Sequence, residues 1–483
     1  MLFARMAKRP SISLPAVGVL LAATAVGLLV LARPAPVPVG LGWLALAPVA
    51  ALVVGGVARA ATLAGAVAYV LALDWAYTAH FSPVYAYNGL IDAHPAPEAL
   101  LLVGGLAVLP AAWLPVSVRR PSTIVLWTLY TAGYVPVAMV PIYLTGELEP
   151  ILSFEVALVS SMAILGLIVR VCPPTIRVPH LSLTAYTRVL TALAALCLLY
   201  IAVTFGVRAL PGLAEVYATR AQFDAAEGGA AAGGYIVPWA ANAINPMLMA
   251  LGIAHRRWSL VALGLLGQLL IYGDTGYKAV LFSVALVPLV YVAISRGGRS
   301  FGPLAAMGTA VVLVGAVLAS SAPGDWALAL ATRVFATPGH VTWYYVDYFS
   351  SHPQYHLSHS FLGWLFSSPY SSDPPLLIGS VYFHQGTDAN ASMWGDAFAN
   401  FGFAGVIGFT VVGGVLLLLA DALGRGRDAR IAGPMLATVG LALGSTGVFT
   451  TVLTQGFALG CVLMALMPPS SNHVAGAPAG SSG

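Results

Sequence analysis

Charged residues are scarce in this chain, and their scarcity excludes a soluble protein. Asp, Glu, Lys and Arg make up 8% of the 483 residues, whereas soluble globular proteins contain about 25%. Hydrophobic residues account for 59%, so this composition cannot build a water-facing surface. Lipid offers no hydrogen bonds to a backbone, and only helices or a closed barrel can therefore cross it. The apolar stretches run for about twenty residues without polar alternation, which predicts helices.

Cysteine is equally sparse, and several enzyme motifs are missing. Cys172, Cys197 and Cys461 lie in or beside apolar stretches, so we expect no disulfide framework, and no Cys/His spacing resembles a zinc site. The sequence contains no internal repeat, no Gly-rich phosphate loop between a strand and a helix, and no G-x-S-x-G nucleophile motif. The net charge of +4 says little by itself, because the placement of the charges matters more.

The apolar stretches predict an all-α polytopic membrane protein with about 14 transmembrane helices. The predicted spans are 12–32, 39–57, 61–79, 98–117, 122–144, 151–170, 187–206, 235–254, 258–273, 277–295, 303–321, 404–421, 432–448 and 450–467. The first follows Arg5, Lys8 and Arg9 and also resembles a signal peptide, although its apolar run is long for one. The segment 432–467 is barely long enough for two crossings, so a re-entrant hairpin stays open there.

Arginine sets the orientation. With the N-terminus in the cytoplasm, most arginines fall on the cytoplasmic side, as the positive-inside rule expects. They are Arg59, Arg119, Arg120, Arg170, Arg177, Arg188, Arg256, Arg257, Arg296, Arg299, Arg425, Arg427 and Arg430. Both termini are then cytoplasmic.

This orientation divides the chain into membrane segments and outer loops. A loop of about eighty residues is usually functional or disordered, and the longest outer loop is rich in Trp, Tyr and Phe, so we expect it to fold over the membrane face. Within it we expect helices at Trp326–Thr337 and Val341–Ser351, separated by Pro338-Gly339. The predicted divisions are 1–321 (transmembrane helices with outer loops 80–97 and 207–234), 322–403 (large helical extracytoplasmic loop), 404–467 (C-terminal transmembrane helices) and 468–483 (disordered tail).

Five cations break the positive-inside rule, and topology does not explain them: Arg33, Arg208, Arg220, Lys278 and Arg333. Arg33 is best explained as a residue that snorkels to the interface. Lys278 begins an apolar span, where a charge costs up to about 2.5–3.5 kcal/mol. It either snorkels, pairs with Asp274, or points an ammonium group at an anion in a cavity.

Arg220 and Arg333 can likewise be explained either structurally or as parts of a site. A helix would bring Arg220 close to Glu215 and Tyr217, either as a solvated ion pair or as part of a site. Arg333 lies on a predicted helix, with His340 beyond the Pro-Gly break. Guanidinium groups bind two phosphate oxygens at once. A meeting of these arginines with Lys278 would predict a phosphate or diphosphate ligand.

Histidines and acids of the large loop are the remaining candidates. His352, His356 and His359 would share a helical face and hold a metal, but Pro353 and Ser358 argue against a regular helix there. Ordinary loop histidines, or a single base, remain open. Asp396 precedes a span, where it either complements the helix dipole or takes part in chemistry.

Several segments together resemble the Wzy-type oligosaccharide repeat-unit polymerases of the O-antigen polymerase and ligase superfamily. The matching residues cover 207–300 and 325–410, about two fifths of the chain. They are Glu215, Tyr217, Arg220, Tyr235, Pro238, Trp239, Asn245, Pro246, Thr275, Gly276, Tyr277, Lys278, Arg333, Pro338, Gly339, Ile378, Gly379, Tyr382, Phe383, Ala389, Asn390, Ala391, Asp396, Asn400, Phe401, Gly402 and Gly405.

The resemblance implies a GT-C-like membrane glycosyltransferase of the bacterial cytoplasmic (inner) membrane. Such an enzyme polymerises undecaprenyl-diphosphate-linked oligosaccharide repeat units into a surface polysaccharide, with inversion and without a metal or other cofactor. Membrane lipid and a chain-length regulator protein are the partners it implies, and nucleic acid is not among them.

The residues fit that chemistry, because preplaced cations stabilise a departing diphosphate. The catalytic candidates are Glu215, Arg220, Lys278, Arg333, His359 and Asp396. The substrate-binding candidates are Arg208, Tyr217, Tyr277, His340, Tyr344, Tyr345, Asn390, Trp394 and Asn400. Trp343, with Tyr344, Tyr345 and Trp394, would either stack on sugar rings or pack the folded loop.

Three other functions remain open. A ligase would transfer the glycan to another acceptor, and the sequence does not separate the two acceptors. A transporter or flippase for lipid-linked glycans would place ionisable residues near the middle of its spans, whereas Asp74 and Glu155 lie close to the ends of the predicted spans. A sensor or scaffold predicts no convergence of cations.

Overall fold

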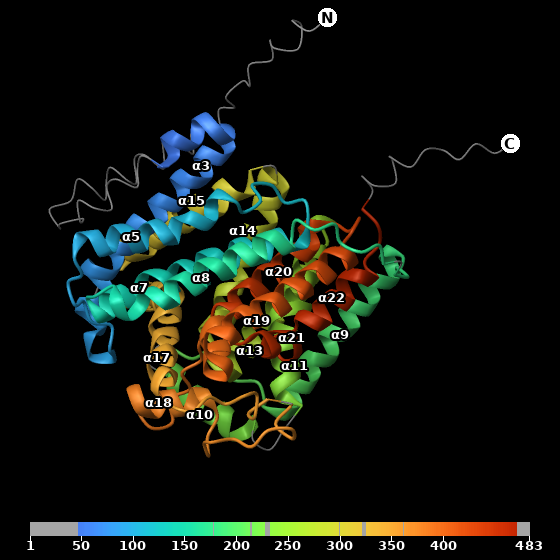
Figure 1. Cartoon of the computed structure of the whole chain (residues 1–483). Helices are drawn as coiled ribbons and strands as arrows, with labels where there is room; N and C mark the ends of the chain where they lie inside the picture. Colours follow the sequence, from blue (N-terminus) through green and yellow to red (C-terminus); the bar gives the residue numbers. More distant parts are fainter. Residues whose placement is uncertain are drawn as a thin grey trace, which may run out of the picture.

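The computed structural model describes residues 47–176, 178–212, 215–227, 232–298, 300–320, 325–360 and 362–470, and all regular elements in these ranges are helical (Figure 1). Nine helical segments in them are long and apolar enough to cross a membrane. The chain is therefore a multi-pass helical membrane protein, and this part of the predicted fold class is confirmed.

These nine segments correspond to nine of the predicted spans. They are Gly56–Asn88, Pro121–Thr145, Glu149–Ile168, Leu183–Thr204, Gly233–Ala254, Lys278–Arg296, Phe301–Ala319, Met393–Leu423 and Val448–Leu466. The predicted spans at 98–117 and 432–448 correspond to shorter apolar helices, Pro97–Ala112 and Ala429–Leu443. The predicted span 258–273 lies within a helix, Trp258–Thr275. The span 12–32, most of 39–57 and the tail from 471 lie outside the described residues.

The first half of the chain is a succession of long helices joined by short connections. Its elements are α3 (Ala47–Ala76), η3 (Tyr77–Phe81), α4 (Ser82–Tyr85), η4 (Ala86–Asn88), α5 (Pro97–Val108), η5 (Leu109–Ala112), α6 (Pro121–Leu129), η6 (Tyr130–Tyr134), α7 (Val135–Thr145), α8 (Glu149–Ile168), α9 (Leu183–Thr204), α10 (Val216–Glu227), α11 (Gly233–Trp239), η7 (Ala240–Ile244) and α12 (Asn245–Ala254).

The second half contains more breaks within its helices. Its elements are α13 (Trp258–Thr275), α14 (Lys278–Gly297), α15 (Phe301–Ala319), α16 (Trp326–Phe335), α17 (Thr337–Ser351), α18 (Pro374–Tyr382), α19 (Met393–Leu423), α20 (Ala429–Leu443), α21 (Val448–Leu453) and α22 (Phe457–Leu466).

Arginines from several predicted cytoplasmic loops meet at one end of the bundle, which we call the basic end. Arg59 donates to the carbonyls of Ala111 and Leu114 at 2.9 and 2.7 Å. Arg120 donates to the carbonyls of Val169 and Val171, at 2.7 Å in both cases. These arginines satisfy carbonyl groups where neighbouring helices end. We call the opposite end, which the positive-inside rule predicts to be extracytoplasmic, the distal end.

Three spans contain a π-helical turn, and a proline follows each of them by two residues. The turns are η3, η6 and η7, and the prolines are Pro83, Pro136 and Pro246. Proline lacks an amide proton and its ring collides with the carbonyl four residues earlier. The wider π turn relieves that collision and keeps the helix continuous across the span.

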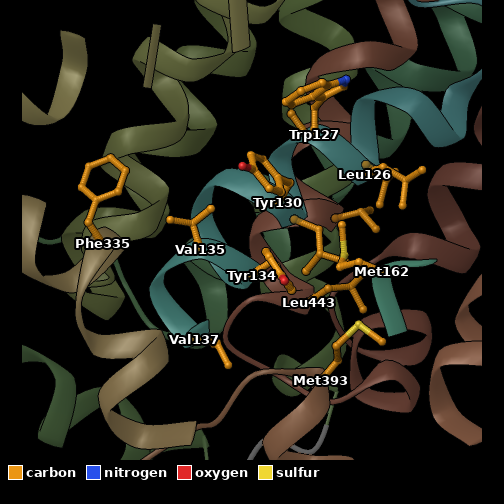
Figure 2. Close-up of a cluster of buried hydrophobic side chains, with 14 of the residues drawn as sticks. Leu126, Trp127, Tyr130, Tyr134, Val135, Val137, Met162, Phe335, Met393 and Leu443 are labelled. Carbon is orange, nitrogen blue, oxygen red and sulfur yellow. The ribbon is translucent and has the colours of Figure 1, made fainter. Parts of the chain in front are cut away.

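The core lies around α6, η6 and α7, where Trp127, Tyr130 and Tyr134 are fully buried (Figure 2). Tyr130 and Tyr134 stack at 5.8 Å, and their hydroxyls donate to the carbonyls of Ala107 and Leu106. This span is the most enclosed of the nine. It therefore forms the centre about which the other helices pack.

The segment predicted as one large outer loop, 322–403, enters the bundle. Phe335 at the end of α16 contacts Tyr69, well inside the helical segment Gly56–Asn88, at 5.9 Å between ring centroids. Gly339 in the first turn of α17 lies against Pro136 in the middle of another span, and a Cβ atom at Gly339 would collide with the Pro136 carbonyl. The pair α16–α17 is therefore a re-entrant helical hairpin. Its break lies at Ala336, just before Pro338 and Gly339 and not at them.

The next span also begins earlier than predicted, because α19 is two helical segments joined by a sharp reversal. Its backbone leaves helical geometry at Phe401 and at Gly402, where φ is 56°. The methyl group of Met393 lies 3.9 Å from the position of a Cβ atom on Gly413, so the first segment runs back alongside the second. Residues 403–423 extend about 30 Å, the thickness of a bilayer core. Residues 393–400 therefore lie within that thickness.

The C-terminal region also differs from two plain spans. Helix α20 has 15 residues, and α21 and α22 are separated at Thr454–Gly456, where Gly456 has a φ of 88°. By length and hydropathy, α21 and α22 together form one candidate span, Val448–Leu466. The region 429–466 is thus a short helix followed by a broken one.

Candidate functional site

The reversal in α19 leaves backbone groups available at the distal end of the span. Because the helix breaks at Phe401 and Gly402, the carbonyls of Ala399 and Asn400 accept from another segment. The amide groups of Tyr355 and His356 donate to them at 3.0 and 3.2 Å. The loop that follows α17 is thereby fixed to the tip of α19.

Asn400, a predicted substrate-binding residue, has a structural role at this junction. It is fully buried, and its side-chain oxygen accepts from the amide of Leu357 at 2.8 Å. Its side-chain nitrogen donates to the carbonyl of Asp396 at 2.8 Å. Asn400 therefore positions both the loop and Asp396.

The loop turns through backbone conformations that residues other than glycine rarely adopt. His356 and Leu357 have φ angles of 51° and 64°, which are costly for residues other than Gly and occur where the surroundings enforce them. The hydrogen bonds that this loop donates to Ala399 and Asn400 hold the backbone in these conformations. The turn delivers His359 to the side of α19.

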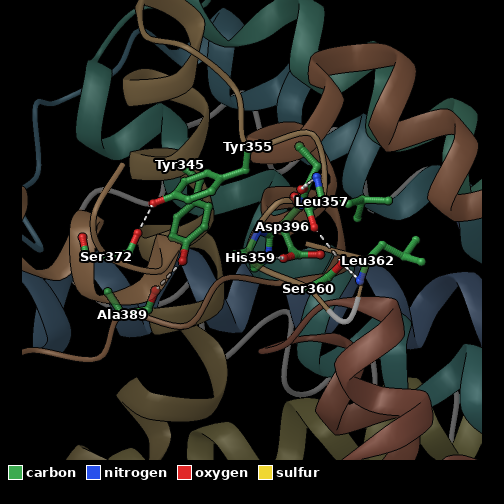
Figure 3. Close-up of polar contacts among 10 residues, drawn as sticks. Tyr345, Tyr355, Leu357, His359, Ser360, Leu362, Ser372, Ala389 and Asp396 are labelled. Carbon is green, nitrogen blue, oxygen red and sulfur yellow. Dashed lines mark hydrogen bonds and ion pairs between the residues drawn. The ribbon is translucent and has the colours of Figure 1, made fainter. Parts of the chain in front are cut away.

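His359 and Asp396 form a pair at this place (Figure 3). The His359 Nε2 atom is 3.8 Å from an Asp396 carboxylate oxygen, and the side chains are 18% and 22% exposed. The other ring nitrogen, Nδ1, is buried without a hydrogen-bond partner in the described part of the chain. The Asp396 carboxylate also lies against Gly447, where any Cβ atom would collide with it. Both groups are thus held in place while remaining open to a small reactant.

Such a pair can act as a general base. A neutral imidazole takes a proton from a hydroxyl group near neutral pH, and an adjacent carboxylate stabilises the imidazolium that forms. Asp396 is in the first turn of α19, so the macrodipole alternative from the sequence also holds for it. Within the ranges described, no group of three or more His, Cys, Asp or Glu side chains is arranged to hold a metal ion.

Several predicted sugar-stacking aromatic residues are buried in the scaffold of this loop. Tyr345 is 1% exposed and donates to the carbonyl of Ala389 at 3.0 Å, and Trp394 is 0% exposed. Trp343 is also buried. Burial and neighbouring Tyr370 raise the pKa of Tyr355, whose hydroxyl donates to the carbonyl of Ser372 at 2.6 Å. For Tyr345, Trp394 and Trp343 the packing alternative therefore describes the structure better.

A second set of candidates gathers where α10 meets the junction of α13 and α14. The Arg220 guanidinium lies over the Tyr277 ring at 5.1 Å from its centroid, and Lys278 follows Tyr277 as the first residue of α14. Arg208 donates to Gln222 on α10 at 3.3 Å. We call Arg208, Arg220 and Lys278 the cation group. Three of the four cations predicted to converge in the outer loops are therefore on neighbouring elements.

The two acids predicted near these cations are Glu215 and Asp274. Glu215 accepts from the amide of Gly212 at 3.1 Å. The Asp274 carboxylate is buried and lies close enough to Arg208 of the cation group to interact with it electrostatically. The Arg220 Nε atom is buried and has no hydrogen-bond partner among the described residues. The side chain of Tyr217 lies outside the described residues.

The remaining candidates are on other elements. Arg333 is exposed on α16, a helix that packs against α15 and α17, and not on the elements of the cation group. His340 is buried against Tyr344 at 4.6 Å between rings, and Tyr344 stacks on Tyr382 at 4.2 Å. Asn390 donates to Asp388 at 2.6 Å.

The His359–Asp396 pair and the cation group are linked through two short helices. Gly447, against which Asp396 packs, precedes α21, and the carbonyl of Leu453 at the end of α21 accepts from Trp239 of α11 at 2.8 Å. Helix α11 follows α10 in the chain. The two sets are thus connected through α21 and α11.

Sequence reasoning missed how these residues are held. Gly402, Gly405 and Gly447 supply the reversal and the close approaches, since a Cβ atom at Gly405 would collide with the Ala397 carbonyl. The run Asn400-Phe401-Gly402 was the available signal, because Asn and Gly are the residues that favour left-handed backbone.

Comparisons with known proteins add no name to this site. No protein-family model matches the chain, and neither the curated proteins nor the solved structures include a significant match to it.

Proposed function

We propose that the protein is a membrane glycosyltransferase that polymerises undecaprenyl-diphosphate-linked oligosaccharide units at the distal face of a bacterial cytoplasmic membrane. The observation that carries the proposal is the pairing of His359 with Asp396 at 3.8 Å, held by a strained turn at the distal end of a span. Asp396 lies about one helical turn, or 6 Å, below Asn400 at the tip of α19. Asp396 therefore lies just inside the predicted boundary of the bilayer core, within reach of a lipid-borne reactant.

The reaction would use the pair as its base. His359 Nε2 takes the proton of an acceptor sugar hydroxyl as its oxygen attacks the anomeric carbon of the donor. The bond between that carbon and the phosphate oxygen breaks, and the lipid diphosphate leaves with the bonding electrons. Asp396 stabilises the imidazolium during this step.

The cation group would receive the diphosphate. Negative charge grows on the leaving group as the glycosidic bond breaks, and preplaced positive charges lower the barrier. Arg220 is oriented by the Tyr277 ring, and its Nε atom has no hydrogen-bond partner among the described residues. Guanidinium and ammonium groups both bind phosphate, the former through two parallel hydrogen bonds.

The test is glycan elongation by the purified protein in proteoliposomes with lipid-linked repeat units. Replacing the base by His359→Gln, or its partner by Asp396→Asn, should reduce the elongation rate by about 10²–10⁴-fold. His384→Gln is the matched control, because His384 is exposed in the same loop region, and it should elongate normally. Normal elongation by both site variants would refute the proposed base. Transfer to an acceptor other than a lipid-linked repeat unit would indicate a ligase-type reaction instead.

A flippase for lipid-linked glycans is the second candidate, because the spans contain buried acids. Glu155 and Asp74 are 0% and 1% exposed, and the helix that contains Asp74 extends to Asn88, so Asp74 is not close to its end. Tyr143 donates to Asp74 at 2.6 Å. Intramembrane acids are typical of transport pathways. Movement of lipid-linked units across the bilayer without formation of longer glycans would support this function.

A further inference from the structure

Three consecutive apolar side chains project from the loop that carries His359. Trp364, Leu365 and Phe366 are 80%, 52% and 44% exposed. No Asp, Glu, Lys or Arg occurs in residues 357–372. We call residues 364–366 the apolar tip. Neighbouring exposed apolar side chains of this size are typical of a surface that contacts a partner or a membrane.

The apolar tip follows a turn that is fixed to the distal end of α19. The turn that precedes it is compact, because the amide of Gly363 donates to the carbonyl of Ser360 at 2.8 Å and that of Ser360 to Leu357 at 3.0 Å. His359 in this turn reaches Asp396, about one helical turn below the tip of α19. Residues 403–423 are long enough to cross the bilayer core, so we expect its distal boundary near the tip of α19.

Other exposed aromatic residues occur at the starts of helices at the same end. Trp326 begins α16 and is 59% exposed, and Tyr235 in α11 is 45% exposed. At the opposite, basic end, Trp258 is 68% exposed, begins α13 and directly follows the basic pair Arg256 and Arg257. Trp and Tyr concentrate at both membrane–water interfaces, where their rings reach the headgroups. Trp364 fits the distal set.

We propose that the apolar tip inserts into the headgroup and acyl boundary of the distal leaflet and anchors the His359 turn to the membrane surface. The occupant is lipid. Three observations favour insertion at the interface. The tip follows a turn fixed at the distal end, it carries an exposed aromatic ring, and residues 357–372 contain no Asp, Glu, Lys or Arg. The inference does not depend on the proposed chemistry, since it concerns only where the loop rests.

The experiment places an environment-sensitive fluorophore on the tip of the full-length protein in proteoliposomes. Cys172, Cys197 and Cys461 are replaced by Ala or Ser, and the probe is attached to Trp364→Cys or, as the matched control, to Ser371→Cys. Ser371 is exposed in the same loop, seven positions farther along. Size-exclusion profiles establish that both labelled proteins remain folded.

The expected result is blue-shifted emission at position 364, quenched by lipids that carry a nitroxide near the headgroup, and water-like emission at position 371. Adding Leu365→Asp and Phe366→Asp to the Trp364→Cys protein should return the emission to the water-like value. Unquenched emission at 364 would overturn the proposal. Blue-shifted emission at position 364 that appears only when the protein forms dimers, and that lipid nitroxides do not quench, would indicate contact with a second copy. That result would also overturn the proposal.

Discussion

Two acids buried in the spans differ in what surrounds them. Asp421 accepts from the amide and the hydroxyl of Ser122, both at 2.8 Å. Glu155 is fully buried in α8, and neither carboxylate oxygen has a hydrogen-bond partner in the described ranges. An isolated buried carboxylate is expected to be neutral, because the charged form is strongly disfavoured away from water.

Glu155→Gln should therefore change stability by less than about 0.5 kcal/mol, since one neutral group replaces another of the same shape. Asp421→Ala should cost about 1–3 kcal/mol, because it leaves the amide and hydroxyl of Ser122 unsatisfied. Thermal unfolding in detergent checks both variants. A large loss with Glu155→Gln would mean that the carboxylate is charged and bound to a partner.

At the scale of single residues, the sequence identifies candidate functional residues but not how they are arranged in space. His359 and Asp396 were among the predicted catalytic residues, yet 37 positions separate them and their pairing depends on the reversal in α19. The prediction grouped Arg333 with Arg220 and Lys278, whereas the structure places Arg333 on a helix packed against α15 and α17. Side-chain type can be read locally, but contacts between distant segments depend on packing.

The broken helices around α19 distinguish this fold from a simple bundle. The reversal needs Gly402, whose φ of 56° and ψ of −142° lie in a region that residues with a Cβ atom avoid. The loop that holds His359 is bonded to carbonyls on the N-terminal side of this break. The geometry of the pair therefore depends on the reversal.

Gly402→Ala should destabilise the protein by about 1–3 kcal/mol, because Ala must adopt the same strained backbone. Gly408→Ala is the matched control in the same helix, where a Cβ atom meets nothing within 4 Å, and it should be neutral or stabilise by up to about 1 kcal/mol. The midpoints of thermal unfolding measure both changes. Equal midpoints for the two variants would show that the backbone at 402 is not constrained.

Hydropathy predicted the long helices but not the entry of the short helix α16 into the bundle. A run of about twenty apolar residues identifies a span by itself, and nine predicted spans match. Helix α16 has 10 residues, too few to cross, so its entry into the bundle has no hydropathy signal. The packing of the α16–α17 hairpin inside the bundle depends on Gly339 of α17, which permits close approach to Pro136.

The orientation of the whole molecule follows from its arginines. Arg59, Arg120 and Arg425 bond to carbonyls at the basic end, and Arg425 reaches Pro173 beside Cys172. Cys172 is exposed, and Cys461 is buried. Free cysteines thus provide a test of which side the basic end faces.

A membrane-impermeant maleimide should label Cys172 in inverted membrane vesicles and not in right-side-out vesicles, because the basic end is predicted to be cytoplasmic. A Ser371→Cys variant should show the opposite pattern, since it places a thiol on the distal loop. Labelling of Cys172 from the outside would invert the predicted topology.

The central claim is that the molecule breaks the bond between a glycan and its lipid diphosphate. The most direct test measures free undecaprenyl diphosphate released by the purified protein in nanodiscs from lipid-linked repeat units, alongside the lengths of the glycans formed. The proposed function predicts one lipid diphosphate for each new glycosidic bond, and strongly reduced release when Arg220→Gln and Lys278→Gln are combined. Glycans of unchanged length and no released diphosphate from the well-folded wild-type protein would contradict it.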